Sequence, residues 1–309
     1  MTVYPCVKVN LGLNVLRKRS DGYHDLETLF VPSGEYRDVL EIIAGDDWSR
    51  TSASLFARYG AFSFSELSSS PSVPFPSGQE YGPGKPLVQA ISEDGKLMIT
   101  IARKEGVDWN PLDDLCARAY FLLDKDFDLP PVKIYLEKLS PVGAGLGGGS
   151  ADAAFAIREI ARLFDLGLDD AAMAGYAARL GSDCAFFIYG RPMFGEGRGE
   201  MLSDFPMPCL DGFELKIVVP DGISVSTADA YRGISPCIPE IPLRKVLMHP
   251  VSEWKDLLVN DFETTVFAKY PVLASIKQSL YDTGAVYASM SGSGSALFAL
   301  YEKFKKGKI

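Results

Sequence analysis

The segment 141–154 constrains the fold more than any other part of this chain. Five of the seven residues in 143–149 are glycine, which adopts left-handed backbone conformations and lets the main chain approach a ligand closely. An apolar strand-like segment, 132–136, precedes the glycine run, and apolar residues at helical spacing follow it from Ala153. The sequence therefore predicts a strand, a tight loop and a helix in succession.

Such a loop is typical of an anion site. Ser150 stands where the N-cap of the helix is expected, with Asp152 in the first turn. Free backbone N–H groups and the positive end of the helix dipole would then converge on one point, where phosphate is the usual ligand. The predicted phosphate-binding residues all belong to this loop: Pro141, Gly143, Gly145, Leu146, Gly147, Gly148, Gly149 and Ser150.

The glycine pattern by itself leaves other interpretations open. Gly143-x-Gly145-x-x-Gly148 satisfies the dinucleotide-binding fingerprint, but a second helical pattern, and not a second strand, follows the first helix. The Walker A pattern fails because Gly149 occupies the position of its lysine. A tight turn without a ligand is a further alternative, although ordering so many glycines has a high entropic cost.

Composition limits the class of protein. The chain has 309 residues, 47% of them hydrophobic, and a net charge of −9, which predicts a globular protein of up to two domains that binds no nucleic acid. An anionic small-molecule substrate must therefore be held by a local site. No apolar run reaches the ~18–20 residues of a membrane span. The cysteines are scattered without a Cys-x-x-Cys pair, which predicts a reduced, cytoplasmic setting and no metal cluster.

Polar residues interrupt two apolar segments near the start of the chain. Residues 3–16 predict a strand, in which Lys8 and Asn10 alternate with apolar residues. By pattern alone, Lys8 is a solvated lysine on an outer face. After a turn, Tyr23 and His24 follow each other and could offer a stacking face and a hydrogen-bonding edge to a base; two ordinary surface residues are the alternative.

Asp183 follows a helix that ends near Gly181 and precedes the apolar run 184–188, which predicts a strand. A carboxylate beside a buried segment either caps local N–H groups or is placed for chemistry, and the pattern favours capping. A second Gly/Ser loop, 291–295, lies between two short strands and is predicted to touch phosphate or to brace the first loop. Residues 46–95 are rich in Ser, Pro and Gly and predict an inserted surface loop, with a lid over the site as the alternative.

Three motifs in this order, Lys8-x-Asn10, 141–154 and 291–295, resemble the GHMP kinase superfamily. The further segments 21–24, 27–30 and 180–183 are similar to the members that phosphorylate a cytidine diphosphate-linked methylerythritol. The resemblance spans nearly the whole chain except 46–95. It implies an α+β fold of two domains, a ribosomal S5 domain 2-like N-terminal domain (1–209) and a ferredoxin-like C-terminal domain (210–309), with ATP at their junction.

The resemblance implies an ATP- and Mg²⁺-dependent kinase of non-mevalonate isoprenoid (terpenoid) biosynthesis, acting on the 2-hydroxyl of the methylerythritol. Asp183 would be the general base, and Lys8 would keep it ionised and polarise the reacting oxygen. The implied substrate contacts surround the cytosine and the reacting sugar alcohol: Asn10, Tyr23, His24, Thr227 and Tyr231.

Two positions depart from the pattern of the superfamily. Ala151 replaces a second serine, which leaves Ser150 as the hydroxyl available to Mg²⁺, and Asp114 replaces an asparagine near adenine, so that it accepts but cannot donate as an amide does. The alternatives are a related kinase for mevalonate-type, homoserine or sugar substrates, and a catalytically silent nucleotide-binding protein. Tyr23 and His24 argue against the first alternative, and Lys8 with Asp183 argues against the second.

Overall fold

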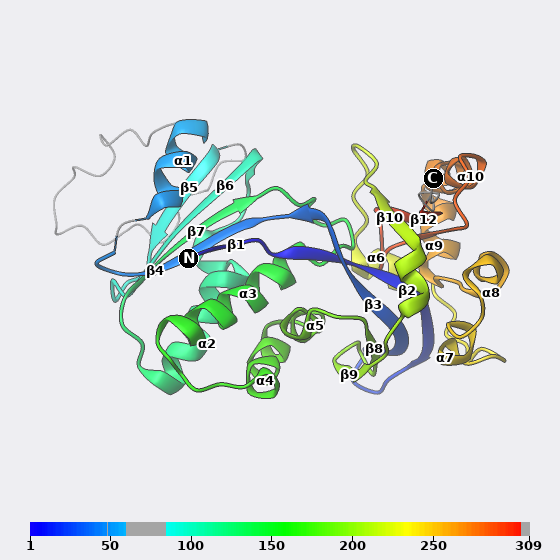
Figure 1. Ribbon diagram of the computed structural model, residues 1–309, viewed down its shortest axis with the longest axis horizontal. Helices are drawn as coiled ribbons and strands as arrows, with labels where there is room; N and C mark the ends of the chain where they lie inside the picture. Colours follow the sequence, from blue (N-terminus) through cyan, green and yellow to red (C-terminus); the bar gives the residue numbers. More distant parts are fainter. Residues whose placement is uncertain (48, 60–84, 304–309) are drawn as a thin grey trace, which may run out of the picture.

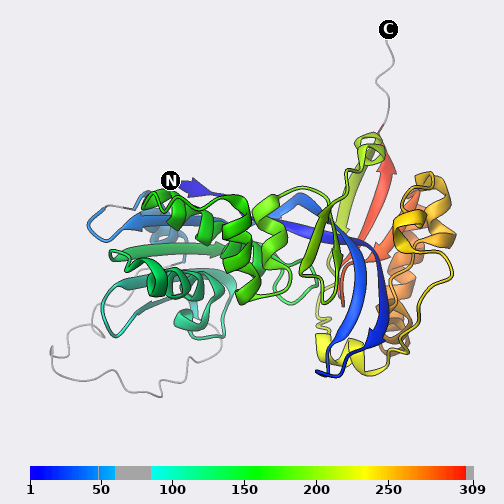
Figure 2. The same cartoon turned by 90° about the horizontal axis from the view of Figure 1, so that it is seen from below.

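A computed structural model describes residues 1–47, 49–59 and 85–303. The molecule is elongated, and its elements gather in two halves that meet in the middle (Figures 1 and 2). One half contains a five-stranded sheet with helices, and the other contains two smaller sheets and the C-terminal helices. In the part of the chain that the structure describes, no helix has both the length and the apolar character needed to span a membrane.

The five-stranded sheet has the order β1-β4-β7-β6-β5, in which only the β6–β7 pair is parallel. Its strands have the following bounds: β1 Thr2–Val3, β4 Val39–Ala44, β5 Lys85–Ile91, β6 Leu97–Val107 and β7 Val132–Lys138. The helices of this half are α1 Arg50–Tyr59, α2 Leu115–Phe127, α3 Gly148–Leu163, α4 Asp170–Leu180 and α5 Cys184–Tyr189. Helices α2 and α3 pack on one face of the sheet and α1 lies over the other (Figure 1).

Alternation along β7 explains why both faces of this sheet are covered. Ile134 and Leu136 are fully buried in the core beneath α2 and α3, whereas Tyr135 points the other way and packs with Leu55 of α1 and Leu87 of β5, as the pleat of a strand requires. Helix α3 presents a row of buried alanines to the core that contains Ile134 and Leu136. Such small side chains let the helix approach the sheet closely.

The second half contains two antiparallel sheets, of order β2-β3-β8-β9 and β10-β12-β11. Their strands are β2 Cys6–Lys18, β3 His24–Arg37, β8 Met193–Glu196, β9 Met201–Asp204, β10 Phe213–Val218, β11 Tyr287–Met290 and β12 Leu297–Glu302. The helices are α6 Thr227–Arg232, α7 Leu243–Val246, α8 Trp254–Leu257, α9 Phe262–Lys269 and α10 Pro271–Asp282. This half therefore combines residues 6–37 with the C-terminal third of the chain.

The long β2–β3 hairpin positions the candidate site, because it carries N-terminal residues into the C-terminal half (Figure 2). Val9 and Leu11 of β2 are fully buried in one core with Trp254 and Phe298. The backbone N–H of Leu13 donates to the carbonyl of Val259 at 2.9 Å. Strand β2 is thus enclosed on both faces, which a pattern of alternating polar and apolar residues does not reveal.

The α+β class and most of the predicted strands and helices are confirmed, with two corrections. The run after Asp183 is helix α5 and not a strand. Its six residues are all buried or half-buried, so the sequence shows no alternation of apolar and polar residues that would distinguish a helix from a strand. Gly190 ends the helix in a left-handed conformation (φ 62°). The segment 46–95 is not a loop throughout, since α1 and β5 fall within it. Its part 60–84 lies outside the described residues, and the domain boundary at residue 209 stays a prediction.

Candidate active site

Lys8 lies on β2 and is buried, with only 3% of the residue exposed. Its Nζ donates to Asn10 Oδ1 at 2.6 Å and to the carbonyl oxygen of Gly145 at 2.9 Å, and it lies 3.4 Å from Asp183 Oδ2. The expectation of a solvated lysine is therefore wrong, because the glycine loop covers this face of β2. An ammonium group in such surroundings is held at one point by oxygen atoms on several sides.

Asp183 occupies the N-cap position of α5, but its carboxylate makes no capping hydrogen bond. The Ser182 hydroxyl donates to Asp183 Oδ1 at 3.2 Å, and 29% of the side chain remains exposed. The capping alternative is therefore wrong. One carboxylate oxygen faces Lys8, and the group remains accessible from the cavity that it lines.

A relay of hydrogen bonds fixes the orientation of Asn10. Its Nδ2 donates to Thr28 Oγ1 at 3.0 Å, and the Thr28 hydroxyl in turn donates to the carbonyl of Gly12 at 2.6 Å. Because the Thr28 oxygen must accept from an amide N–H, the amide oxygen of Asn10 is directed at Lys8. Strand β3, through Thr28, therefore helps to position the lysine on β2.

The glycine loop, 141–150, leads into α3 one turn earlier than predicted. Gly147 is the N-cap residue, in a left-handed conformation (φ 72°), and the helix begins at Gly148. Ser150 is consequently inside the first turn and is not the N-cap, and Asp152 lies beyond the first turn. The loop can tighten in this way because Gly147 has no Cβ. The first N–H groups of α3 have no partner within the helix and remain free to bind an anion.

The second Gly/Ser loop, 291–295, contacts the glycine loop and holds it in place. Of the two roles predicted for this loop, bracing the first loop is confirmed. The Ser291 hydroxyl donates to the carbonyl of Gly145 at 3.1 Å, and the N–H of Ala296 donates to the carbonyl of Ala144 at 3.1 Å. A Cβ on Gly145 would lie 2.3 Å from the carbonyl oxygen of Ser291. Only glycine fits this crossing of two backbones.

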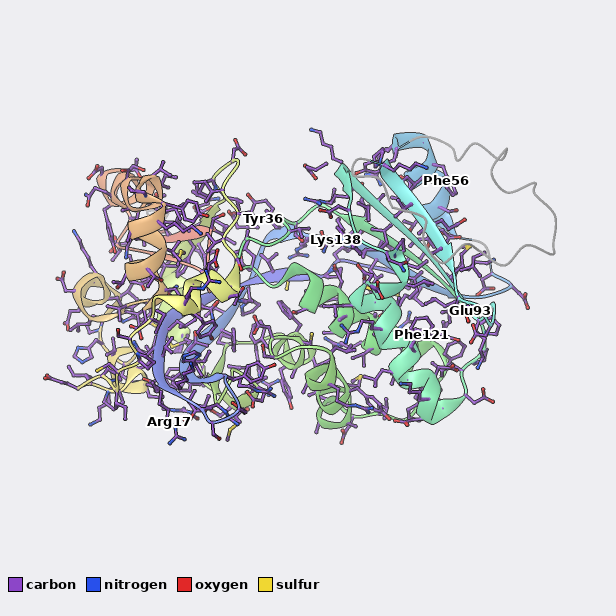
Figure 3. The ribbon with its side chains drawn as sticks, turned by 180° about the vertical axis from the view of Figure 1, so that it is seen from behind. Arg17, Tyr36, Phe56, Glu93, Phe121 and Lys138 are labelled. Carbon is purple, nitrogen blue, oxygen red and sulfur yellow. The ribbon has the colours of Figure 1, made fainter. Side chains whose placement is uncertain are left out.

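A buried ionic cluster lies beneath the glycine loop. Lys138, at the end of β7, pairs with Asp38 and Asp152, and the Asp38 carboxylate also accepts from the N–H groups of Leu139 and Ser140 at 2.6 Å. Figure 3 shows Lys138 near the middle of the molecule. Burial raises the pKa of Asp152 well above its usual range. The cluster ties the strand before the loop to the helix after it, and sequence reasoning missed it because 100 positions separate Asp38 from Lys138.

Two cavities meet at the glycine loop. The first, of about 320 Å³, is lined by Lys8 and Asp183, and the second, of about 440 Å³, is lined by the whole loop together with Trp109 and Asp114. Gly145, Gly147 and Ser150 line both cavities; they mark the border between them. A molecule in one cavity can therefore react with a molecule in the other at this border.

Asp114 has a defined structural role in the second cavity. Its Oδ1 accepts from the N–H of Cys116 at 2.9 Å and caps α2, and its Oδ2 accepts from Trp109 Nε1 at 3.1 Å. Burial raises the pKa of this carboxyl above its usual value. Trp109 and Leu115 line the same cavity, and their apolar surfaces could receive a flat ring.

The predicted substrate-binding residues gather around the first cavity in part. Asn10, Thr227 and Tyr231 line it, and the Thr227 hydroxyl lies 3.1 Å from the Ser293 hydroxyl. His24 stacks directly on Tyr231, with ring centroids 4.8 Å apart and planes at 19°. No base can lie between these two rings in this arrangement. Burial and the charge of Asp183 raise the pKa of Tyr231 to about 12, so that its phenol remains neutral.

Tyr23 is 58% exposed, and its ring lies beneath the guanidinium group of Arg198 at 5.1 Å from Cζ to the centroid. Arg198 itself lines the first cavity and was not predicted from the sequence. The glycines that flank it at positions 197 and 199 mark a turn but give no sign of what the turn faces. Within 1–47, 49–59 and 85–303, no three His, Cys, Asp or Glu side chains form a metal-ligand group.

Family models and relatives identify the family. Residues 114–191 match the N-terminal domain of GHMP kinases, and residues 245–309 match their C-terminal domain. The chain is 40% identical over 302 residues to a 4-diphosphocytidyl-2-C-methyl-D-erythritol kinase of Bacteroides thetaiotaomicron, covering 98% of this chain and 92% of that protein. It is 41% identical over 306 residues to the kinase of that name from Bacteroides fragilis, with 99% and 94% coverage.

Solved structures agree. A crystal structure of a 4-(cytidine 5'-diphospho)-2C-methyl-D-erythritol kinase superposes with a TM-score of 0.67 at 28% identity and covers 97% of this chain and 90% of that chain. A homoserine kinase of Cytophaga hutchinsonii, at 15% identity and a TM-score of 0.60 with 97% and 86% coverage, shares the fold. The dinucleotide-binding interpretation of the glycine loop is therefore wrong, because the fold is that of the GHMP kinases. The chain belongs to the 4-diphosphocytidyl-2-C-methyl-D-erythritol kinases, a family of the GHMP kinases, which use ATP as their phosphate donor.

Proposed function

We propose that this chain transfers the γ-phosphoryl group of ATP to the 2-hydroxyl of 4-diphosphocytidyl-2-C-methyl-D-erythritol, giving the 2-phosphate and ADP, in isoprenoid biosynthesis. The observation that carries the proposal is the pair formed by the buried Lys8 and the accessible Asp183, 3.4 Å apart, in the cavity that adjoins the glycine loop. A base and a cation beside a phosphate-binding loop are the groups that phosphoryl transfer to an alcohol needs.

The acceptor binds in the first cavity with its hydroxyl beside Asp183. The carboxylate accepts the hydroxyl proton as the oxygen attacks phosphorus, and Lys8 Nζ offers its positive charge to the same oxygen and to the transferring group. Because Asn10 Oδ1 and the Gly145 carbonyl fix Lys8, the cation is in place before the reaction, and no reorganisation is needed in the transition state.

ATP binds in the second cavity, with its phosphates against the glycine loop and the first N–H groups of α3. Trp109 and Leu115 would take the adenine. Ser150 lines both cavities, and its hydroxyl is the side-chain oxygen that would hold Mg²⁺ there. When bound, Mg²⁺ neutralises charge on the phosphates.

The cytosine would be held by Tyr23, His24 and Tyr231, with Asn10 and Thr227 on the rest of the acceptor. Because His24 now stacks on Tyr231 at 4.8 Å, the imidazole must turn aside to admit the base. The proposal includes a cytoplasmic setting, which is favoured by the free cysteines Cys6, Cys116, Cys184, Cys209 and Cys237. It includes no nucleic-acid or membrane partner.

The test is ADP release from Mg-ATP by the purified protein, with the cytidine diphosphate acceptor and, in parallel, with mevalonate, homoserine and galactose. We expect release with the cytidine compound alone. Release with one of the other acceptors would retain the kinase and overturn the substrate. ATP binding without release for any acceptor would indicate a silent relative.

A further inference from the structure

The first cavity, in which the acceptor is proposed to bind, is lined by one charged side chain to which the mechanism assigns no role, Arg198. Three ionised side chains line that cavity within the described part of the chain, Lys8, Asp183 and Arg198. Lys8 and Asp183 form a pair and offset each other. Arg198 is therefore the ionised side chain of this cavity that is not neutralised within the cavity lining itself.

The turn that carries Arg198 is fixed against β3. The N–H of Leu26 donates to the carbonyl of Gly197 at 2.7 Å, and the N–H of Gly199 donates to the carbonyl of Glu196 at 3.0 Å. A Cβ on Gly195 would lie 2.6 Å from Phe30 Cε2, so that the β8–β9 hairpin lies directly on the ring of Phe30. The backbone of Arg198 is consequently held at the wall of the cavity by β3.

The guanidinium group retains free donors. Its Nε lies 3.4 Å from Glu200 Oε1, while Glu200 Oε2 accepts from the backbone N–H of Arg198 at 2.6 Å. The other carboxylate in electrostatic contact, Asp21, forms its ion pair with Arg19 at 3.0 Å. Among the described residues, the two terminal amino groups of Arg198 have no hydrogen-bond partner, although the ring of Tyr23 lies beneath them.

We propose that Arg198 binds the diphosphate of the acceptor, an inference that rests on the proposed function. The acceptor is a linear arrangement of cytosine, ribose, diphosphate and methylerythritol. With its base at Tyr23 and its reacting hydroxyl at Asp183, the diphosphate must lie between them. Arg198 has its guanidinium over Tyr23, and a Cβ on the next residue, Gly199, would lie 4.0 Å from Asp183 Oδ1. A guanidinium fork matches two phosphate oxygens.

The phosphates of ATP are the other anions at this site, and the geometry argues against them. Arg198 does not line the second cavity, which is formed by the glycine loop with Trp109 and Asp114. The two assignments predict different effects of a substitution. If Arg198 binds the acceptor diphosphate, replacing it weakens binding of the acceptor and leaves ATP binding unchanged.

The variants Arg198→Gln and Arg198→Lys test the assignment. In Arg198→Gln we expect the KM for the acceptor to rise roughly 10- to 100-fold, since a hydrogen bond between charged groups is lost. The KM for ATP should not change, and kcat should stay within roughly threefold. Arg198→Lys, which keeps the charge but not the fork, should fall between the two proteins. Arg191→Gln is the matched control. Arg191 is exposed, pairs with Asp204, and lies before β8, whereas Arg198 lies after it.

Calorimetric binding of cytidine and of cytidine 5'-diphosphate separates this role from a structural one. The wild-type chain should prefer the diphosphate, and Arg198→Gln should lose that preference while its affinity for cytidine is unchanged. Equal weakening of both ligands, a raised KM for ATP, or an unaltered KM for the acceptor would each overturn the assignment while leaving the kinase intact. Wild-type protein that neither phosphorylates the acceptor nor binds cytidine 5'-diphosphate would overturn the proposed function and, with it, the role of Arg198.

Discussion

Lys8 is held by oxygen atoms from three other residues, Asn10, Gly145 and Asp183. Two of these contacts, to the amide oxygen and the main-chain carbonyl, cannot change charge. Asp183 is the remaining one, and it is the group proposed to take a proton during turnover. The arrangement thus keeps the ammonium group fixed while the charge on its third partner changes.

Asp183→Asn should lower kcat by roughly 10²- to 10⁴-fold, because the amide cannot accept the hydroxyl proton as a base. The KM values for ATP and the acceptor should remain within a few-fold, since the amide retains the shape of the side chain. Steady-state kinetics on the purified variant give both values. Asp204→Asn, at an exposed carboxylate outside both cavities, is the control, and near-normal turnover by Asp183→Asn would disprove the assignment.

Sequence reasoning could reach Lys8 and Asp183 only through the resemblance to known kinases. Pattern alone favoured a solvated lysine and a capping aspartate, because alternation says which residues share a face of a strand but not what covers that face. Arg198 lacked even this support. Its role depends on the distance to Tyr23 and on the neighbourhood of Gly199 and Asp183, which only the folded chain establishes.

The two glycine-containing loops act as one element, since the backbone of one crosses that of the other at Gly145. Gly145→Ala should therefore separate them, because its Cβ would meet the carbonyl oxygen of Ser291 at 2.3 Å and its φ is 78°. Gly143→Ala shares the left-handed conformation (φ 73°) but meets nothing within 4 Å.

We expect Gly143→Ala to lower the free energy of unfolding by about 1–2 kcal/mol, the cost of the left-handed backbone. Gly145→Ala should lower the free energy of unfolding by more than this, and it should also weaken ATP binding. Urea unfolding and ATP titration of both variants measure the difference. Equal stability losses in the two variants would show that the crossing of the loops contributes nothing.

The stack of His24 on Tyr231 joins the β2–β3 turn to helix α6. Binding of a base must break this contact, so that adding cytidine 5'-diphosphate should shift the imidazole proton resonances of His24 as the ring current of Tyr231 is lost. The chain has two histidines, and His249, paired with Glu253, provides an internal control in the same spectrum. An unmoved His24 signal at saturating ligand would contradict the proposed cytosine site.

Elements were predictable where a period or a punctuating residue marked them. The strands predicted in 3–16 and 132–136 and the helix after the glycine run agree with the structure. Helix α5 was not predictable, because a short, wholly buried run looks the same as a strand. Helix α1 was not predictable either, because it has few apolar residues. It is stabilised by packing on a sheet face that the sequence does not show.

At the scale of the whole molecule, burial raises the pKa of Tyr59, Tyr120 and Tyr231 from the usual 10.0 to about 12. Folding therefore favours the neutral phenol. This contribution to stability is complete below about pH 10, and it is lost as the pH rises toward about 12, because the unfolded chain ionises first.

The urea midpoint should consequently be lower at about pH 11 than at about pH 9. Tyr120→Phe, which removes one of these phenols, should reduce the difference between the two midpoints. A midpoint that does not fall with rising pH would contradict the proposed shifts. Tyrosinate absorbance of the folded protein, followed in the same titration, reports the ionisation directly.

The bracing of the glycine loop by residues 291–296 also concerns the order of synthesis. Lys8, the glycine loop and Asp183 all leave the ribosome before Ser291 and Ala296, which donate to the carbonyls of Gly145 and Ala144. A nascent chain therefore contains every residue proposed for catalysis but lacks the segment that holds the loop in position. We expect the growing polypeptide to remain inactive until residues 291–296 have been synthesised, so that shorter nascent chains do not turn over ATP.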